Sequence, residues 1–376
     1  MLDCQRARGI LIFLIVMYVV FLPISEALKN IFGNVLIVFY ILFGDKLRFN
    51  EARIEAKLLL LVGLSAFLAG FSGEISVGMI RSAYQWATPF IIVYILISLR
   101  PSPTDVILIF RAILLGGCCA LLDSFIVWQP HHYPELRSLG HVNHSALYVA
   151  FSLFSIIGLR VTAQEKWLGP EVVLFLLVSP MFLYFASSWV ATCSAIVIIS
   201  CWLILFYDKR KILLGAVFLI IPATLLILRN WAEIYFLFDM RAGFYRSAWL
   251  LGHETLMGYG IGEYGKYVTS ELLDSLIPVE QRFAYRTSNH GHSLFNTVIV
   301  ERGWLGIFCV YGFFVVNLLP KARSLDSGSV GKNFSLYLSF VTIVAGLWQT
   351  TFHLEHGALV TIMFGLSHFL SEPNDL

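Results

Sequence analysis

The sequence predicts an all-α, polytopic helical membrane protein, and two observations lead to this prediction. Hydrophobic residues make up 58% of the 376 residues and charged residues only 13%, with a mean hydropathy of +0.78. A water-soluble domain carries about 25% charged residues. The apolar residues also form continuous runs of about 20 residues, the length that a helix needs to cross a bilayer. A transmembrane β-barrel would instead show alternating segments of about ten residues.

About twelve such runs follow one another along the chain, and each is expected to be a transmembrane helix. They lie near residues 10–25, 30–44, 57–73, 83–99, 105–128, 143–160, 170–186, 189–207, 212–228, 304–319, 334–352 and 357–370. The first run is not expected to be a cleaved signal peptide, because its flank lacks a small-x-small cleavage site and further spans follow. Residues 1–376 are therefore expected to form a single integral membrane domain.

Lysine and arginine are unevenly distributed between the connections, and this predicts the orientation. With the N-terminus in the cytoplasm, most of them fall on cytoplasmic connections, and the short outer connections hold only Lys29, Arg81 and Arg137. This is the positive-inside pattern of membrane proteins. It places the long connection between spans nine and ten, residues 230–292, on the outer face, since long loops are translocated largely regardless of their charge.

The long outer loop, 230–292, is where we expect chemistry on a charged substrate. It gathers basic and imidazole side chains in a chain that otherwise has few: Arg241, Arg246, His253, Lys266, Arg282, Arg286, His290 and His292. Ionisable groups kept in a membrane protein are candidates for function. In the predicted orientation nine of the ten histidines lie on or near the outer face, which predicts a common polar cavity at the outer ends of spans five, six, ten, eleven and twelve.

The first motif of this loop combines arginines with a glycine turn. Arg241, Arg246 and Trp249 precede Gly258-Tyr-Gly260-Ile-Gly262. A guanidinium can bind phosphate oxygens with two parallel hydrogen bonds. In a helix the two arginines would diverge by about 140°, so each is considered separately. The glycines permit tight turns and a close approach of the backbone to a ligand.

The second motif is His290-Gly-His292, followed by Glu301-Arg-Gly303-Trp-Leu-Gly306. His-x-His is a common metal-ligand spacing, and an acidic residue of the loop or His353 could complete such a site. The more economical interpretation is a neutral imidazole that acts as a base or binds substrate by a hydrogen bond. We therefore expect no metal and no other cofactor.

The order and placement of these motifs resemble the O-antigen ligase and polymerase family of bacterial glycosyltransferases. That family has an arginine near a tryptophan, a G-x-G turn, an H-x-H-N stretch and then E-x-G-x-x-G, and the likeness covers about 65 residues. Upstream, Gly140-His-Val-Asn143-His144-Ser-Ala resembles the family's segment before the sixth span. About twelve spans and a long outer loop after the ninth also suit the family.

The resemblance implies an enzyme that performs metal-independent, inverting glycosyl transfer at the periplasmic face of a bacterial inner membrane. The donor would be a glycan on undecaprenyl diphosphate. The acceptor would be a sugar hydroxyl of the lipid A-core, which defines an O-antigen ligase of lipopolysaccharide biosynthesis, or of another lipid-linked repeat, which defines a polymerase. Cationic arginines would stabilise the diphosphate leaving group. Membrane lipids are further expected partners, whereas nucleic acid is not.

Carried over residue by residue, the resemblance assigns roles within the loop. His292 would orient or deprotonate the acceptor, and Arg246 would bind the diphosphate. Arg241 competes with Arg246 for that role, while His290 and Trp249 would help to bind substrate.

The chain departs from the family pattern at two positions. Ser187-Ser188-Trp189 has a tryptophan where the family often has an arginine at the start of the eighth span, and Ser293 replaces the asparagine after the histidine. Arg81 and Arg137, both predicted on the outer face, could supply the missing cation.

Two other classes of function stay open. A transporter or flippase for an anionic lipid-linked glycan is favoured by Arg111 and Asp123 in the fifth span, which are twelve residues and about 18 Å apart and so do not pair. Arg111 is expected to reach lipid headgroups or to line a cavity. The lack of further carboxylates at mid-depth and of inverted repeats counts against transport. A structural or regulatory subunit is the third class.

Overall fold

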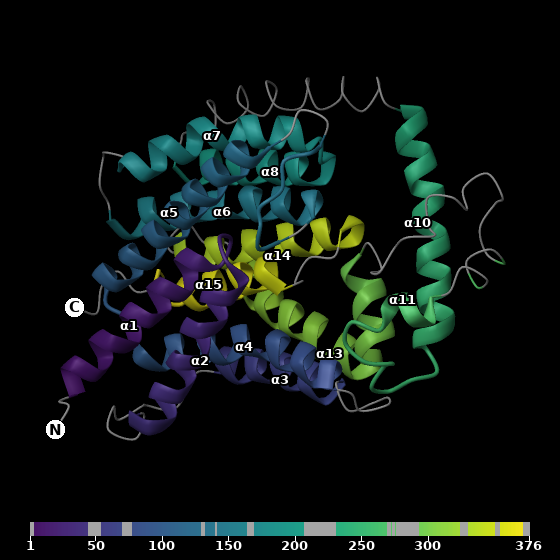
Figure 1. Ribbon diagram of the computed structural model, residues 1–376, viewed down its shortest axis with the longest axis horizontal. Helices are drawn as coiled ribbons and strands as arrows, with labels where there is room; N and C mark the ends of the chain where they lie inside the picture. The colour runs from purple at the N-terminus through teal and green to yellow at the C-terminus, as the bar shows by residue number, and fades with distance from the viewer. Residues whose placement is uncertain are drawn as a thin grey trace.

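The computed structural model describes residues 4–43, 54–69, 77–128, 132–139, 141–163, 169–206, 231–268, 293–323, 330–349 and 354–370, with Leu272 and Ser275. Throughout these residues the chain forms helices and no strand, which confirms the all-α prediction (Figure 1). The helices are α1 (Cys4–Phe21), α2 (Glu26–Phe43), α3 (Ile54–Ala69), α4 (Val77–Leu99), α5 (Pro103–Val127), α6 (Val142–Ala163), α7 (Pro170–Ala186), α8 (Trp189–Phe206), α10 (Trp231–Gly252), α11 (Tyr264–Tyr267), α13 (Leu294–Arg323), α14 (Val330–Trp348) and α15 (Leu354–Ser367).

The helices α1–α8 and α13–α15 coincide with eleven of the predicted spans, and the predicted ninth span, 212–228, lies outside the described residues. Within the residues that the structure describes, five helical segments are long and apolar enough to cross a membrane: Glu26–Phe43, Ile80–Leu99, Pro103–Val127, Val142–Thr162 and Leu294–Val316. The protein is therefore an all-helical, membrane-embedded protein in its described part. The count of twelve spans stays a prediction.

Polar contacts between helix ends define the two ends of the bundle. The Arg8 guanidinium, near the start of α1, lies 3.1 Å from the Asp105 carboxylate at the start of α5. Lys29, near the start of α2, forms an ion pair with Glu355 at the start of α15. The Ser138 hydroxyl, between α5 and α6, donates a hydrogen bond to Glu355 (3.3 Å). We call these the Arg8 end and the Glu355 end; α1 and α5 run toward the Glu355 end, and α2 and α15 run away from it.

The core of the bundle surrounds α6, and α2 lies at its edge. The segment Val142–Thr162 is 83% buried, because α5, α7, α8 and α15 pack around it. A helix that is apolar on all sides is stable in such a central position. By contrast only 17% of Glu26–Phe43 is buried. Its exposed apolar side chains fit contact with lipid tails.

The two charged residues of α5 pair with different partners. Arg111 Nε lies 3.3 Å from the Glu171 carboxylate at the start of α7, and Asp123 lies 2.8 Å from Arg137 Nε in the connection after α5. The expected separation of Arg111 from Asp123 is thus observed. Arg111 was expected to reach lipid headgroups or to line a cavity; its side chain pairs with Glu171 and remains 45% exposed, so that expectation stays a prediction.

The predicted long loop 230–292 begins with a 22-residue helix, α10. The Tyr245 hydroxyl donates a hydrogen bond to the Leu347 carbonyl near the end of α14 (2.7 Å). In Figure 1, α10 stands at the right-hand edge, roughly across the direction of α6, α8 and α14. The helix forms there because Phe244 and Ala248, four residues apart on one face, are buried against Ile299 and Val300 of α13.

Candidate functional site

Helix α13 is interrupted at Gly303, whose φ of 59° and ψ of −156° are not helical. Only glycine adopts this region of backbone space without strain. In a continuous helix the N–H groups of Trp304 and Leu305 would bond to the carbonyls of Val300 and Glu301. The interruption leaves these four groups in need of other partners.

The glycine turn that follows α10 supplies those partners. Four backbone hydrogen bonds join the two segments: from Tyr259 N–H to Val300 (2.8 Å), from Gly260 N–H to Glu301 (3.1 Å), from Trp304 N–H to Thr255 (3.3 Å) and from Leu305 N–H to Leu256 (2.9 Å). Gly258 has a φ of 74°, and a Cβ there would overlap the Arg302 backbone N. The two glycine motifs of the sequence thus form one unit, which we call the glycine interlock (residues 255–264 and 300–306).

Two buried charged side chains hold the interlock to its surroundings. The Glu301 carboxylate, 4% exposed, accepts backbone hydrogen bonds from Gly262 and Tyr264. The Arg302 guanidinium, also buried, lies 4.2 Å from the centroid of the Trp86 ring of α4, a cation–π contact. Glu301 therefore fixes the turn to α13, and Arg302 fixes α13 to α4. The sequence placed both residues in a motif but did not indicate their partners.

Tyr259 presents a phenol at the surface of the interlock. Its ring stacks on Tyr267 with the centroids 4.3 Å apart. Burial, followed by the nearby charge of Glu254 and by Tyr267, raises the pKa of the Tyr259 hydroxyl above its ordinary value. The hydroxyl therefore stays protonated at neutral pH and can donate a hydrogen bond to a ligand.

Arg246 and Trp249, two of the predicted site residues, lie on α10 beside the interlock. They are three residues apart and so share one face of the helix. Arg246 is exposed, and no hydrogen bond or ion pair joins it to any residue that the structure describes. Trp249 lies edge-on to Trp304 (5.7 Å between centroids) and stacks on His253 (6.0 Å). The Trp304 Nε1 donates to the His253 carbonyl (3.2 Å), which completes an aromatic cluster next to Arg246.

Arg241, the competing arginine, belongs to the same helix. It precedes Arg246 by five residues on α10, so the two Cα–Cβ directions diverge by about 140°. The contacts of the Arg241 side chain lie outside the described part of the structure. By helical spacing Trp249 lies about 80° from Arg241 and about 60° from Arg246, and of the two arginines only Arg246 has a side chain that the structure describes.

Arg81 and Arg137, the two other predicted cations, lie in different surroundings. Arg81 is exposed on α4, and the hydroxyl of its neighbour Ser82 lies 3.9 Å from the position of a Cβ on Gly262. Arg137 is held by Asp123, so its charge is already compensated. The structure thus brings the segment of Arg81 to the interlock, but not that of Arg137.

Trp189, in the position of the family's arginine, makes an apolar surface. It is the first residue of α8 and is 39% exposed. Its side chain lines a groove together with Phe340 and Val344 of α14. No cationic residue lines this groove within the described part of the chain.

His290 and His292 lie outside the described residues, but Ser293, which follows them, is well defined. The Ser293 Oγ accepts a hydrogen bond from the Asn296 backbone N–H (3.0 Å) at the start of α13. Serine and asparagine are both favourable N-cap residues. Ser293, which stands in place of the family's asparagine, therefore still caps α13. The histidine motif comes directly before this cap.

The described histidines lie in different surroundings, and their predicted common cavity stays a prediction. His253 belongs to the aromatic cluster on α10, whereas His356 is buried edge-on to Phe151 (4.5 Å) inside the bundle. His141 and His144 pack together at the start of α6, with 5.2 Å between ring centroids. Among the residues described, no three His, Cys, Asp or Glu side chains are grouped to hold a metal ion.

The chain matches no known protein-family model and no curated protein. The fold itself defines an all-helical, membrane-embedded protein with a folded unit at one end of the bundle. Its function is therefore inferred from the residues of that unit.

Proposed function

We propose that the chain is a glycosyltransferase of the bacterial inner membrane, with its active site facing the periplasm. It would move a glycan from undecaprenyl diphosphate to a sugar hydroxyl of the lipid A-core, as an O-antigen ligase, or of another lipid-linked repeat, as a polymerase. The observation that carries the proposal is the glycine interlock. It joins the two glycine motifs of the resemblance and lies beside the exposed Arg246.

The position of Arg246 suits a lipid diphosphate. The donor's diphosphate lies at the depth of the lipid headgroups, because its polyprenyl chain stays in the hydrocarbon. Trp249 is three residues after Arg246 on α10 and packs edge-on to Trp304, and tryptophans are enriched at this depth in membrane proteins. A guanidinium that has no partner among the described residues is available to bind the phosphate oxygens.

The reaction is a single displacement at the anomeric carbon. The acceptor oxygen forms a bond to the anomeric carbon while the bond between that carbon and the diphosphate oxygen breaks. This displacement inverts the configuration at the anomeric carbon. The acceptor proton passes to His292, and undecaprenyl diphosphate leaves with the bonding electrons. Arg246 stabilises the negative charge that develops on the leaving oxygen, so it acts in the transition state more than in the ground state.

The test is complementation of a deletion strain with Arg246→Ala, Arg246→Lys and His292→Ala, reading membrane insertion and surface polysaccharide together. Arg246→Ala and His292→Ala are each expected to reduce glycan transfer at least about 100-fold at normal insertion. Arg246→Lys should retain part of the activity, since it keeps the charge but loses the bidentate geometry. Lys266→Ala is the matched control, because Lys266 is an exposed cation of the same segment that already pairs with Glu263 (3.5 Å).

The deletion strain itself separates the two activities. Polysaccharide that accumulates on its lipid carrier and is missing from lipid A indicates a ligase, whereas accumulation of single repeats indicates a polymerase. Full polysaccharide from both alanine variants would contradict the enzyme proposal. Movement of the lipid-linked glycan in liposomes without a new glycosidic bond would then favour the transporter.

A further inference from the structure

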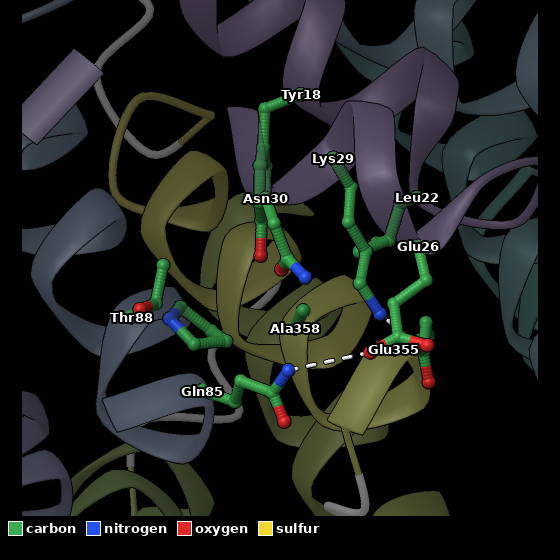
Figure 2. Close-up of a pocket in the computed structure, with 10 residues that line it drawn as sticks. Tyr18, Leu22, Glu26, Lys29, Asn30, Gln85, Thr88, Glu355 and Ala358 are labelled. Carbon is green, nitrogen blue, oxygen red and sulfur yellow. Dashed lines mark hydrogen bonds and ion pairs between the residues drawn. The ribbon is translucent and has the colours of Figure 1, made fainter. Parts of the chain in front are cut away.

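The groove between α8 and α14 is large enough to hold a segment of hydrocarbon chain. Its volume is about 120 Å³. In another protein an apolar cavity of about 150 Å³ binds benzene, and an isoprene unit is slightly smaller than benzene. The polar pocket beside Lys29 and Glu355 has a volume of about 20 Å³ and room for water alone (Figure 2). Of these two cavities, only the groove can take part of an organic ligand.

The lining of the groove is suited to an apolar occupant. Valine, alanine and aromatic side chains form most of it, among them Trp189 of α8 with Phe340 and Val344 of α14. These three side chains are 39%, 52% and 41% exposed, so the groove is open at the surface of the bundle. Ser194 supplies the hydroxyl of the lining, and it already donates to the Val190 carbonyl of its own helix (2.8 Å). A polar occupant would give up bonds to water without replacement.

The groove begins at the Glu355 end of the bundle. Helix α5 runs toward that end, and Trp128, directly after it, packs on Phe185 near the end of α7 with the ring centroids 4.7 Å apart. Helix α8 begins three residues after α7 ends, so Trp189 lies at this end as well. From Trp189 the lining continues to Val197, about 12 Å along the helix axis. The groove therefore runs from the Glu355 end toward the middle of the bundle.

Helix α10 brings the exposed Arg246 close to the mouth of the groove. The Tyr245 hydroxyl donates to the Leu347 carbonyl of α14 (2.7 Å), and Arg246 is the next residue of α10. Leu347 follows Val344, which lines the groove, by three residues, or about 4.5 Å along α14. A guanidinium and an apolar groove are therefore neighbours. A single ligand with an anionic head and a hydrocarbon chain can reach both.

We propose that this groove binds the polyprenyl chain of the lipid diphosphate whose head Arg246 binds. The methyl branches of a polyprenyl chain make it thicker than the straight acyl chain of a bilayer lipid, so it leaves less empty space between α8 and α14. Dispersion attraction falls steeply across a gap, and a chain that fills the groove is therefore favoured. The identity of this lipid as the glycan donor rests on the proposed function, whereas the preference of the groove for a branched chain does not.

The experiment is photo-crosslinking of the purified full-length chain in phosphatidylcholine nanodiscs. The probe is a geranylgeranyl diphosphate analogue with a diazirine at the end of its chain, and mass spectrometry locates the cross-linked residues. Unlabelled geranylgeranyl diphosphate and hexadecyl diphosphate are the competitors. The second has a straight, saturated chain of the same main-chain length. The mapping uses the wild-type protein, so it does not depend on the folding of any variant.

Two variants change the groove in opposite ways, and each has a matched control. Val344→Phe fills the groove, and its control is Val316→Phe, the same change at a position 43% exposed on α13. Phe340→Ala removes one wall, and its control is Phe13→Ala at a position 56% exposed on α1. Unfolding midpoints of all four variants show whether they are folded.

We expect cross-links on α8 and α14, with geranylgeranyl diphosphate competing about tenfold better than hexadecyl diphosphate. Val344→Phe and Phe340→Ala should each weaken probe binding about tenfold, and the two controls should leave it unchanged. Cross-links confined to other helices, or probe binding that ignores Val344→Phe, would overturn the assignment. Equal competition by the straight chain would show a groove for bilayer lipid tails in general and would overturn it too.

The same protein separates this inference from the proposed function. Arg246→Ala is expected to lose glycan transfer in cells and to bind the probe more weakly, with the remaining cross-links still on α8 and α14. Wild-type protein that cross-links in the groove but transfers no glycan contradicts the proposed function alone. Wild-type protein that transfers glycan while the probe cross-links elsewhere contradicts the groove assignment alone.

Discussion

Gly258 and Gly303 are in contact through their backbones, and neither position has room for a side chain. A Cβ on Gly303 would overlap the backbone of Leu256 and Gly258, and both glycines have positive φ. The close approach lets backbone groups of the turn replace the helical hydrogen bonds that α13 loses at Gly303. Two single residues therefore decide whether the interlock can form.

Gly258→Ala and Gly303→Ala are each expected to lower the free energy of unfolding by about 1–3 kcal/mol, because each adds backbone strain and a steric overlap. Thermal unfolding of the purified protein followed by intrinsic fluorescence measures the change. Gly312→Ala is the control on the same helix: a Cβ there meets no atom within 4 Å, and alanine stabilises a helix interior by about 0.5–1 kcal/mol. Equal effects of all three substitutions would show that the interlock does not need its glycines.

At the scale of elements, a local signal starts α13, whereas a tertiary contact stabilises α10. Helix α13 has a local start signal, since Ser293 caps it directly after the histidine motif. Helix α10 is stabilised by contact, because its buried face depends on Ile299 and Val300 of α13. Helix α13 follows the histidine motif in the sequence and contains residues 300–306 of the interlock.

Loss of the cap should be measurable in both stability and function. Ser293→Ala is expected to cost about 1 kcal/mol of unfolding free energy, whereas Ser293→Asn should stay close to the wild-type value. Ser98→Ala on α4 is the control, because Ser98 only donates to the Tyr94 carbonyl of its own helix (2.8 Å). Unfolding midpoints and glycan transfer are compared. A larger loss in Ser293→Asn than in Ser293→Ala would contradict the capping role.

At the scale of the whole molecule, the directions of α1, α2, α5 and α15 fit the predicted order of crossings, while the twelve crossings themselves stay a prediction. Arg8 and Asp105 mark one end of the bundle, and Lys29 and Glu355 mark the other. The interlock belongs to the Glu355 end, because Ser82, near the start of α4, lies beside Gly262, and Gln85 of the same helix donates a hydrogen bond to Glu26 at the start of α2 (3.3 Å). The proposed catalytic unit and the Lys29–Glu355 ion pair therefore lie at the same end of the bundle.

The orientation can be tested with single cysteines in a variant whose six natural cysteines are replaced. Glu254→Cys, at a position 73% exposed at the Glu355 end, should react with a membrane-impermeant maleimide in intact spheroplasts. Arg6→Cys, near the Arg8 end, should react only after lysis, because basic residues favour the cytoplasmic side. The reverse labelling pattern would reject a periplasmic site.

The sequence alone determined the class of the protein and the positions of most helices. A run of apolar residues is a local property, and in a bilayer every backbone polar group must be bonded within the segment, so such a run has to be a helix. Helix α10 was not predicted, because its polar residues interrupt any apolar run. It is stabilised by packing on α13 instead. Arg246 and Trp249 were offered as site residues by the resemblance alone, and their role in a site stays a prediction.

Only the tertiary structure decided which charges meet. Arg302 with Trp86, and Lys29 with Glu355, are far apart in the sequence, and no local pattern indicates that they are in contact. The pairing of Arg137 with Asp123 likewise removed a cation that the sequence had offered to the substrate. Hydrophobic patterning constrains each helix separately, whereas an ion pair depends on how helices pack side by side. The interlock and the Lys29–Glu355 ion pair are products of that packing.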